Sequence, residues 1–175
     1  MKKTKINKFK KGFTIVEVII ACSIITITVL SLMSVASKGI ELSGRSLRQT
    51  QSNSLLEEGV EAVKTIRDNN WSTISSLVLD TPYYLFYNIN TNTWALFNSS
   101  DTPTSSIPTY PIDGIFSRQV VFQGVSRDSE DNIQEVTNPS DIDDGIKKVT
   151  VTVTWTSSGS LVSKDIVFYL ADIFN

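Results

Sequence analysis

The chain begins with a long apolar block that contains a single charge. Between residues 13 and 36, seventeen of the twenty-four side chains are apolar, and Glu17 is the only charged one. About 20 predominantly apolar residues are enough to cross a bilayer as a helix. The block therefore predicts a membrane-spanning helix with a carboxylate near one of its ends.

Beyond residue 36 the apolar positions form a stripe on one side of a helix. Leu56, Val60 and Val63 have the spacing of a single helix face. The whole stripe comprises Leu47, Leu55, Leu56, Val60, Val63 and Ile66. Because no proline interrupts the pattern, we expect one continuous helix from about Phe13 to Arg67, with residues 37–70 as its amphipathic half.

After residue 70 the pattern changes to the two-residue alternation of β-strands. Aromatic runs on either side of Asn90-Thr91-Asn92 predict a hairpin, and the four residues from Ser157 to Ser160 predict the turn of another. The expected strands are 83–89, 93–97, 116–125, 133–136, 147–156 and 161–170. Segments 98–114 and 127–145 are expected to be exposed loops, apart from the short strand near residue 133.

The last hairpin indicates that the sheet has one apolar face. Val149, Val151 and Val153 alternate with threonines, and Ile166 and Phe168 continue the apolar side. An antiparallel sheet of this kind buries one face, and the stripe on the helix can cover it. The sequence predicts an α+β fold, in which a long N-terminal helix packs on an antiparallel sheet formed by residues 71–175.

Charge is distributed unevenly along the chain. The first twelve residues hold six of the sixteen Lys and Arg and no acid, although the net charge of the whole chain is −2. Without residues 1–12, ten basic and eighteen acidic side chains remain, a net charge of −8. This negative charge disfavours general nucleic-acid binding. Lysines beside an apolar span hold that flank in the cytoplasm, so the sheet is expected on the outer side.

The reactive residues of the chain are few. It has no histidine, and its one cysteine, Cys22, lies in the apolar block. An intrachain disulfide is therefore impossible. Outside the apolar block the chain also lacks the histidine and cysteine residues on which most nucleophilic catalysis and metal binding depend. We expect no enzyme activity and no cofactor. A hydrolase with two carboxylates about 5 to 9.5 Å apart in a cleft is disfavoured, because the acids gather in loops.

A secretory signal peptide and a plain membrane anchor are the alternatives for the N-terminal segment. Ser34-Val35-Ala36 fits the small-x-small pattern of signal cleavage, but signal apolar regions span about 7 to 15 residues. Neither alternative accounts for Glu17, because a charge within hydrocarbon costs about 2.5 to 3.5 kcal/mol. The plain anchor corresponds to a second function, a single-pass membrane protein with a β-rich binding or adhesion module at the cell surface.

The junction before the apolar block gives a more specific interpretation. The lysine-rich leader ends at Gly12, Phe13 begins the block, and Glu17 is the fifth residue after the junction. This combination resembles the N-terminal signature of the type IV prepilin and pseudopilin family, with a minor pilin as the favoured kind. The resemblance implies a pilin fold and a structural role in a type IV pilus or a type II secretion-like filament.

The same resemblance implies a processing site, partners and a location. Prepilin peptidase would remove the leader, residues 1–12, by cutting between Gly12 and Phe13, and would methylate the amine of Phe13. Glu17 would then lie near the amine of a neighbouring subunit. The other expected partners are pilin or pseudopilin subunits and the inner-membrane assembly platform. The chain would cross the cytoplasmic membrane once through residues 13–36, with its N-terminus cytoplasmic, and later join a pilus or pseudopilus at the cell surface or in the periplasm.

Two acidic clusters and an aromatic group are further candidates. Calcium takes six to eight oxygen ligands, and the clusters offer Asp128, Glu130, Asp131, Asp141, Asp143 and Asp144. Neither cluster has the EF-hand spacing, so solvated loops are the favoured interpretation over a metal site. The aromatic group comprises Tyr83, Tyr84, Phe86, Tyr87, Trp94 and Phe97. We expect it to form the core of the hairpin, with an adhesive surface as the alternative.

Overall fold

The computed structural model describes residues 12–98, 112–135 and 141–173. A long helix, α1 (Ile15–Asn69), is followed by a short helix, α2 (Ser72–Ser75), and by six strands. The strands are β1 (Pro82–Asn88), β2 (Thr93–Asn98), β3 (Phe116–Arg127), β4 (Ile133–Glu135), β5 (Ile146–Ser157) and β6 (Ser160–Ala171). The chain divides into two compact units, one up to Ser46 and one from Leu47 onward, and α1 contributes to both.

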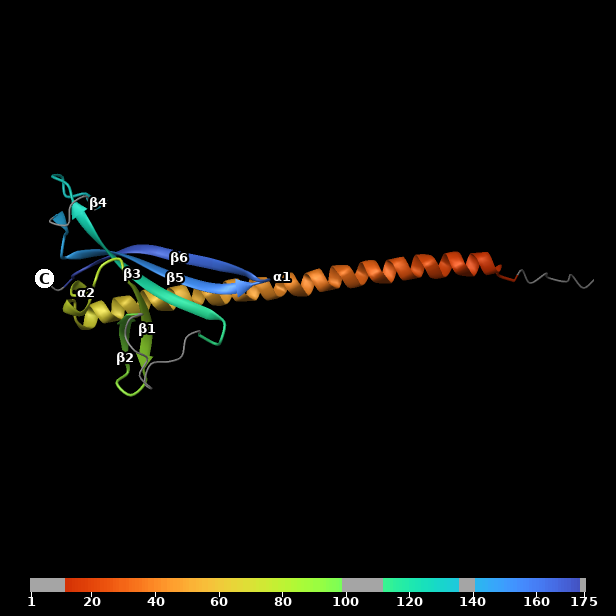
Figure 1. Ribbon diagram of the computed structural model, residues 1–175, viewed down its shortest axis with the longest axis horizontal. Coiled ribbons are helices and arrows are strands. Elements are labelled where there is room, and N and C mark those ends of the chain that lie inside the picture. Colours follow the sequence, from red (N-terminus) through yellow and green to blue (C-terminus); the bar gives the residue numbers. More distant parts are fainter. Residues whose placement is uncertain (1–11, 99–111, 136–140, 174–175) are drawn as a thin grey trace, which may run out of the picture. The chain divides into compact units, whose positions relative to one another are not determined.

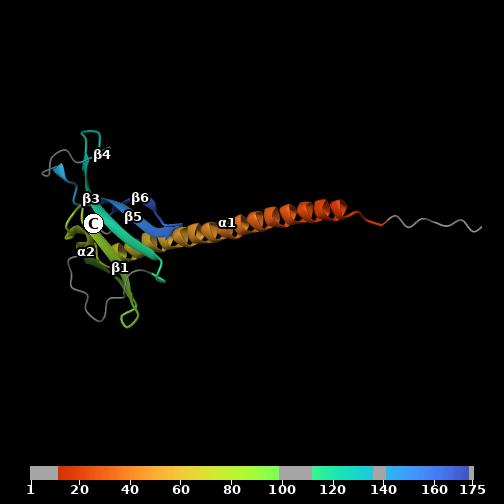
Figure 2. The same cartoon turned by 45° about the vertical axis from the view of Figure 1, so that its right-hand side comes forward.

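The strands of the second unit form one antiparallel sheet in the order β2-β1-β3-β5-β6, with β4 paired to β3 (Figure 1). The β5–β6 pairing extends from Ile146↔Ala171 to Ser157↔Ser160. In contrast, β1 meets β3 at two described pairs, Pro82↔Val121 and Tyr83↔Val120. The β1–β2 hairpin extends away from β3 beyond these pairs in both views (Figures 1 and 2).

The turn between β5 and β6 is shorter than the sequence predicted. Ser158 and Gly159 have φ values of 50° and 80°, as a two-residue type I′ turn requires. Ser157 and Ser160, which we assigned to the turn, pair with each other as the last residues of the two strands. The prediction was therefore wrong by one residue at each end.

The second half of α1 covers one face of the sheet. Val149, Val151 and Val153 are fully buried, and the threonines between them are half-buried, which confirms the single apolar face. The buried residues of α1 are Ser52, Leu56, Gly59, Ala62, Val63 and Ile66. A long apolar helix packed on an antiparallel sheet is the predicted pilin-like α+β arrangement, and the structure confirms it.

The contact face of the helix differs from the predicted stripe. Leu47 is 60% exposed, so its assignment to the buried stripe was wrong; the buried residues of α1 begin at Ser52. Small residues form much of the contact instead. A Cβ atom on Gly59 would lie only 2.7 Å from Val151 Cγ1 and 3.1 Å from Arg118 Cδ. The helix and the sheet therefore approach so closely that this position admits no side chain.

The predicted element boundaries agree with the structure to within a few residues. Helix α1 begins at Ile15 and ends at Asn69, instead of the expected Phe13 and Arg67. Strand β4 confirms the expected short strand as far as Glu135, whereas Val136 and most of the expected loop at 98–114 lie outside the described residues.

Candidate functional site

The candidate processing site immediately precedes α1. Gly12, Phe13 and Thr14 lie before the first helical residue, and Phe13 is 80% exposed. The Thr14 Oγ1 atom accepts a hydrogen bond from the backbone N–H of Glu17 at 3.4 Å. A threonine followed three residues later by a glutamate is the signature of a capping box, a signal that our sequence analysis missed. Thr14 thus helps to fix the start of the helix and places Glu17 in its first turn.

Glu17 is an exposed carboxylate without a counter-charge in the described part of the chain. The helix N-terminus carries about half a positive charge, which favours an acid in the first turn. The apolar block contains no Lys, Arg or His, and none of the ion pairs among the described residues includes Glu17. The described residues therefore offer Glu17 no full counter-charge.

The apolar half of α1 has the properties of a membrane span. Among the described residues, α1 is the one helix that is long and apolar enough to cross a bilayer. Its hydroxyl groups bond within the helix: those of Ser23, Thr26, Thr28 and Ser31 each donate to the carbonyl oxygen four residues earlier at 2.8 Å. Because hydrocarbon offers polar groups no partners, these internal bonds make the segment compatible with lipid.

Asp128, the first residue of one acidic cluster, organises the turn between β3 and β4. Its carboxylate accepts hydrogen bonds from the backbone N–H groups of Glu130 at 2.9 Å and Asn132 at 2.8 Å. The side-chain amides of Asn132 and Gln134 donate to its Oδ2 atom at 3.1 and 3.0 Å. Asp128 therefore acts as a turn-forming residue, and Glu130 is exposed in the same turn.

Arg127 joins the two acidic clusters. Its Nε donates to Asp143 Oδ2 at 2.6 Å, and its Nη1 donates to Asp131 Oδ1 at 3.1 Å. Asp144 lies 3.7 Å from the ammonium of the buried Lys147, and Asp141 is exposed at the start of a described segment. Within residues 12–98, 112–135 and 141–173, no three acids gather in a way that could hold a metal ion. The guanidinium of Arg127 itself bridges the two clusters.

We expect the folded domain to lose stability at acidic pH. The hydrogen bond from Arg127 holds the pKa of Asp143 below its ordinary value, and the side chain of Asn132 does the same for the pKa of Asp128. Each carboxylate adds stability that is fully present above its unfolded pKa, about 3.9, and is lost as the pH falls through the lower folded value. The melting temperature of the wild type should therefore decrease more below about pH 4 than that of the Asp143→Asn variant.

Glu130→Gln is the control for this pH series, because Glu130 lies in the β3–β4 turn next to Asp131 and its side chain is exposed. This variant should keep the wild-type dependence of melting temperature on pH. Identical pH dependence in the wild type and in Asp143→Asn would show that the Arg127–Asp143 contact does not contribute to acid sensitivity.

The aromatic group is divided between the core and the surface of the hairpin. Tyr83 is 5% exposed and Trp94 packs against the core, whereas Tyr87 is exposed and its ring lies 5.1 Å from that of Trp94. Phe86 and Phe97 are half-buried, with ring centres 5.6 Å apart. Of the six residues, Tyr83 belongs to the core and Trp94 packs against it, so the expected hairpin core is confirmed only in part. Tyr87 is the exposed member of the group.

Arg118 is a buried cation that our sequence analysis missed. Its side chain is 3% exposed, and its Nη1 donates to Leu55 O at 3.0 Å and lies 3.3 Å from Glu58 Oε2. The guanidinium also lies 5.5 Å from the centre of the Trp94 ring, close enough for a cation–π contact. The sequence signal that could have revealed it is the position of Arg118 two residues after Phe116, because residues two apart on a strand lie on the same face of the sheet. Arg118 connects β3 with α1 and β2 and is a structural residue.

Comparison with known proteins gives one match, and it lies on the candidate processing site. Residues 7–33 match the family model described as the prokaryotic N-terminal methylation motif. The matched region includes Gly12, Phe13, the cap residue Thr14 and Glu17. No curated protein and no solved structure matched the chain.

Proposed function

From the type IV prepilin-like methylation motif that this chain carries at residues 7–33, we propose that the protein is a subunit of a type IV pilus or of a type II secretion-like filament. Within that filament it is a minor subunit. Prepilin peptidase cuts the chain after Gly12 and methylates the amine of Phe13. The processed chain remains in the cytoplasmic membrane with Phe13 at the cytoplasmic side. The assembly platform then adds it to a filament of pilin or pseudopilin subunits.

The electrostatics of Glu17 support this assignment. Cutting after Gly12 creates a positive amine on Phe13, close in sequence to a carboxylate that lacks a partner in the described part of the chain. An ion pair at about 4 Å gains about 4 kcal/mol at an effective dielectric constant of 20. Desolvation of the two charges is of similar size, so the net stabilisation is small. The main effect of the pair is to fix how far one subunit is shifted along its neighbour, because a subunit added at any other position leaves a carboxylate unpaired in hydrocarbon.

The β-rich unit has a structural rather than a catalytic role in this proposal. Its polar clusters are bonded internally: Asp128 holds a turn, Arg127 joins two loops, and Arg118 connects the helix to the sheet. A single-pass surface protein would share the span and the sheet. It would not, however, need a methylation motif at the junction.

Substitution of Gly12 tests the processing step. A Cβ on Gly12 meets no atom within 4 Å, so Gly12→Val should leave the fold unchanged while it blocks the peptidase. We expect this variant to insert in the membrane and to keep residues 1–12, whereas the wild type loses them. The measurement is the intact mass of the chain extracted from membranes of cells that contain the peptidase.

Gly39→Val is the control, since Gly39 also has no atom within 4 Å of an added Cβ but lies away from the junction. It should be processed like the wild type. If the wild type kept Met1, or if Gly12→Val were cut as efficiently as the wild type, the chain would be a tethered surface module and not a filament subunit.

A further inference from the structure

The last strand of the sheet, β6, has a long edge that no described strand covers. Strand β6 ends the strand order and pairs with β5 without a bulge from Ser160 to Ala171. Its twelve residues include no proline and no glycine. Proteins protect such an edge with a short strand, a proline, a bulge or charged side chains, because its backbone groups can pair with another chain. Of these devices, β6 has only the charges of Lys164 and Asp165.

Alternate residues of β6 direct their backbone groups to this edge. In an antiparallel pair, residues that exchange N–H···O bonds alternate with residues that do not. The N–H of Asp172 donates to Gly145 O at 2.8 Å, which continues the register beyond the Ile146↔Ala171 pair. The even-numbered residues of β6 therefore bond to β5, and the odd-numbered residues from 161 to 169 turn their N–H and C=O groups outward. Among the described residues, no hydrogen bond takes up these outward groups.

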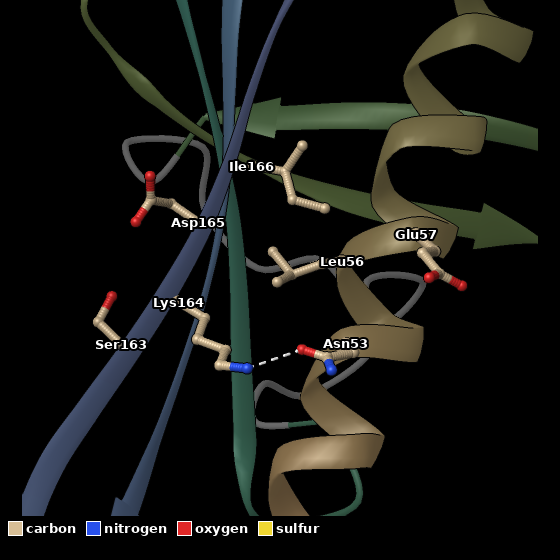
Figure 3. Close-up of a pocket in the computed structure, with 7 residues that line it drawn as sticks. All are labelled: Asn53, Leu56, Glu57, Ser163, Lys164, Asp165 and Ile166. Atoms are coloured by element: carbon tan, nitrogen blue, oxygen red, sulfur yellow. Dashed lines mark hydrogen bonds between the residues drawn. The ribbon is translucent and has the colours of Figure 1, made fainter.

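The side chains of β6 divide between the two faces of the sheet. Lys164 and Ile166 point toward α1, whereas Ser163 and Asp165 point away from it (Figure 3). On the helix side, a groove of about 390 Å³ lies between α1 and β6. Its apolar part is formed by Leu56, which is 3% exposed, and the half-buried Ile166. A strand added at the edge would place every second side chain over this groove and extend the core beyond β6.

The outer face of the edge carries exposed apolar side chains and one acid. Leu161, Val167 and Tyr169 are 75%, 47% and 52% exposed. Asp165 lies between them, opposite the uncharged Thr152 of β5, and none of the ion pairs in the described part of the chain includes it. A basic side chain directly opposite Asp165 on an added strand would therefore form a favourable cross-strand pair.

We propose that the edge of β6 from Leu161 to Tyr169 receives an extended strand from a different subunit of the same filament. Main-chain hydrogen bonds supply the affinity, and alternate side chains supply the specificity. The incoming strand carries apolar residues on the side of α1 and a Lys or Arg opposite Asp165. This inference rests on the proposed function, because a minor subunit has chains other than its own copies as neighbours.

The geometry favours a strand, and the charge favours a different chain. Only another strand offers C=O and N–H groups at the spacing of the outward groups of β6. Two β6 edges of identical copies, paired antiparallel over residues 161–169, would place Asp165 opposite Asp165. Like charges in this position are destabilising. Such a two-fold contact would also close after two copies and would not continue a filament.

Photo-crosslinking tests the contact in the full chain in its own cells. Benzoylphenylalanine replaces Leu161 in one variant and Tyr169 in another. In sheared filaments, both probes should crosslink to the same other subunit. Because strands advance equally per residue, the two attachment points, located by mass spectrometry, should lie about eight residues apart in one segment. The control probe replaces Ile89, which is 84% exposed in the turn between β1 and β2, at the other end of the strand order. It should not crosslink to that segment.

Val167→Pro tests the backbone bonds of the edge. The N–H of Val167 faces outward, so its loss leaves the β5–β6 ladder intact, and proline is accepted on edge strands. Crosslinking from the probe at residue 161 should decrease about tenfold, because proline removes the donor. The control, Val167→Thr, keeps the N–H and the branched shape and should crosslink like the wild type. Asp165→Lys leaves the backbone unchanged and should lower the yield severalfold.

The outcomes separate this contact from the filament function. Subunits that enter filaments without crosslinks from either probe, or with equal yields in Val167→Pro and Val167→Thr, would overturn the contact and leave the filament function standing. Attachment points that do not share one segment would overturn the strand as occupant. A crosslink to this chain itself would overturn the different subunit. Absence of the chain from filaments would overturn both proposals.

Discussion

Replacement of Gly59 by leucine is expected to destabilise the second unit by about 3 kcal/mol. The first atom of the new side chain would lie 2.7 Å from Val151 Cγ1, a separation that real Cβ atoms essentially never show. Val151 is fully buried on β5, which is paired on both sides by β3 and β6. Because protein interiors are close-packed, the helix would have to move away from the sheet. Urea unfolding of the full chain in detergent micelles, followed by tryptophan fluorescence, measures the effect.

Gly44→Leu is the matched control for this prediction. An added Cβ at Gly44 meets no atom within 4 Å, and leucine is favoured over glycine in a helix by up to about 1 kcal/mol. This variant should therefore be as stable as the wild type or slightly more stable. If the two substitutions changed the free energy of unfolding equally, the effect at Gly59 would come from leucine in the helix in general and not from a close helix–sheet contact.

Replacement of Glu17 by glutamine is expected to reduce incorporation into filaments at least about tenfold, which corresponds to about 1.4 kcal/mol. The neutral amide keeps the shape of the side chain and lowers the cost of insertion in lipid, so the chain should still reach the membrane. It cannot pair with the amine of Phe13 on a neighbouring subunit, and that amine would be left as an uncompensated charge in hydrocarbon, which costs far more than the intact pair contributes. The measurement is the ratio of the chain in sheared filaments to the chain in membranes.

The control for this experiment is Glu61→Gln, which removes a carboxylate from the same helix outside the span. Glu61 is 69% exposed and pairs with Lys64 at 2.8 Å, and exposed pairs of this kind contribute little. Its filament-to-membrane ratio should match that of the wild type. A Glu17→Gln chain that entered filaments at the wild-type level would remove Glu17 from the assembly contact.

Periodicity predicted the elements of the fold well because the signals were long. The valine–threonine alternation before Ser157 defines β5, and the absence of proline allowed one helix through both compact units. The contact face of α1 was harder to predict. Ser52, Gly59 and Ala62 are buried there, but the predicted stripe consisted of large apolar residues and therefore included the exposed Leu47. Close approach of helix and sheet favours small residues, and only the structure shows where that approach occurs.

The strand order and the internal ion pairs also required the structure. Strand β3 pairs with β5 although β4 lies between them in the sequence. The alternation of apolar and polar residues within a strand does not show which other strand it pairs with. Arg118 was missed because a charged residue normally indicates an exposed position, and its partners Leu55 and Glu58 are about 60 residues away in the chain. The candidate site at Gly12, Phe13 and Glu17 could be proposed from the sequence because the motif at residues 7–33 is a local signal.

The most direct test of the whole account is the intact mass of this chain in filaments sheared from the cells that make it. The account predicts a chain that begins at Phe13, carries one added methyl group at its amine and lacks residues 1–12. A chain that still begins at Met1, or that is recovered from membranes but never from sheared filaments, would contradict it.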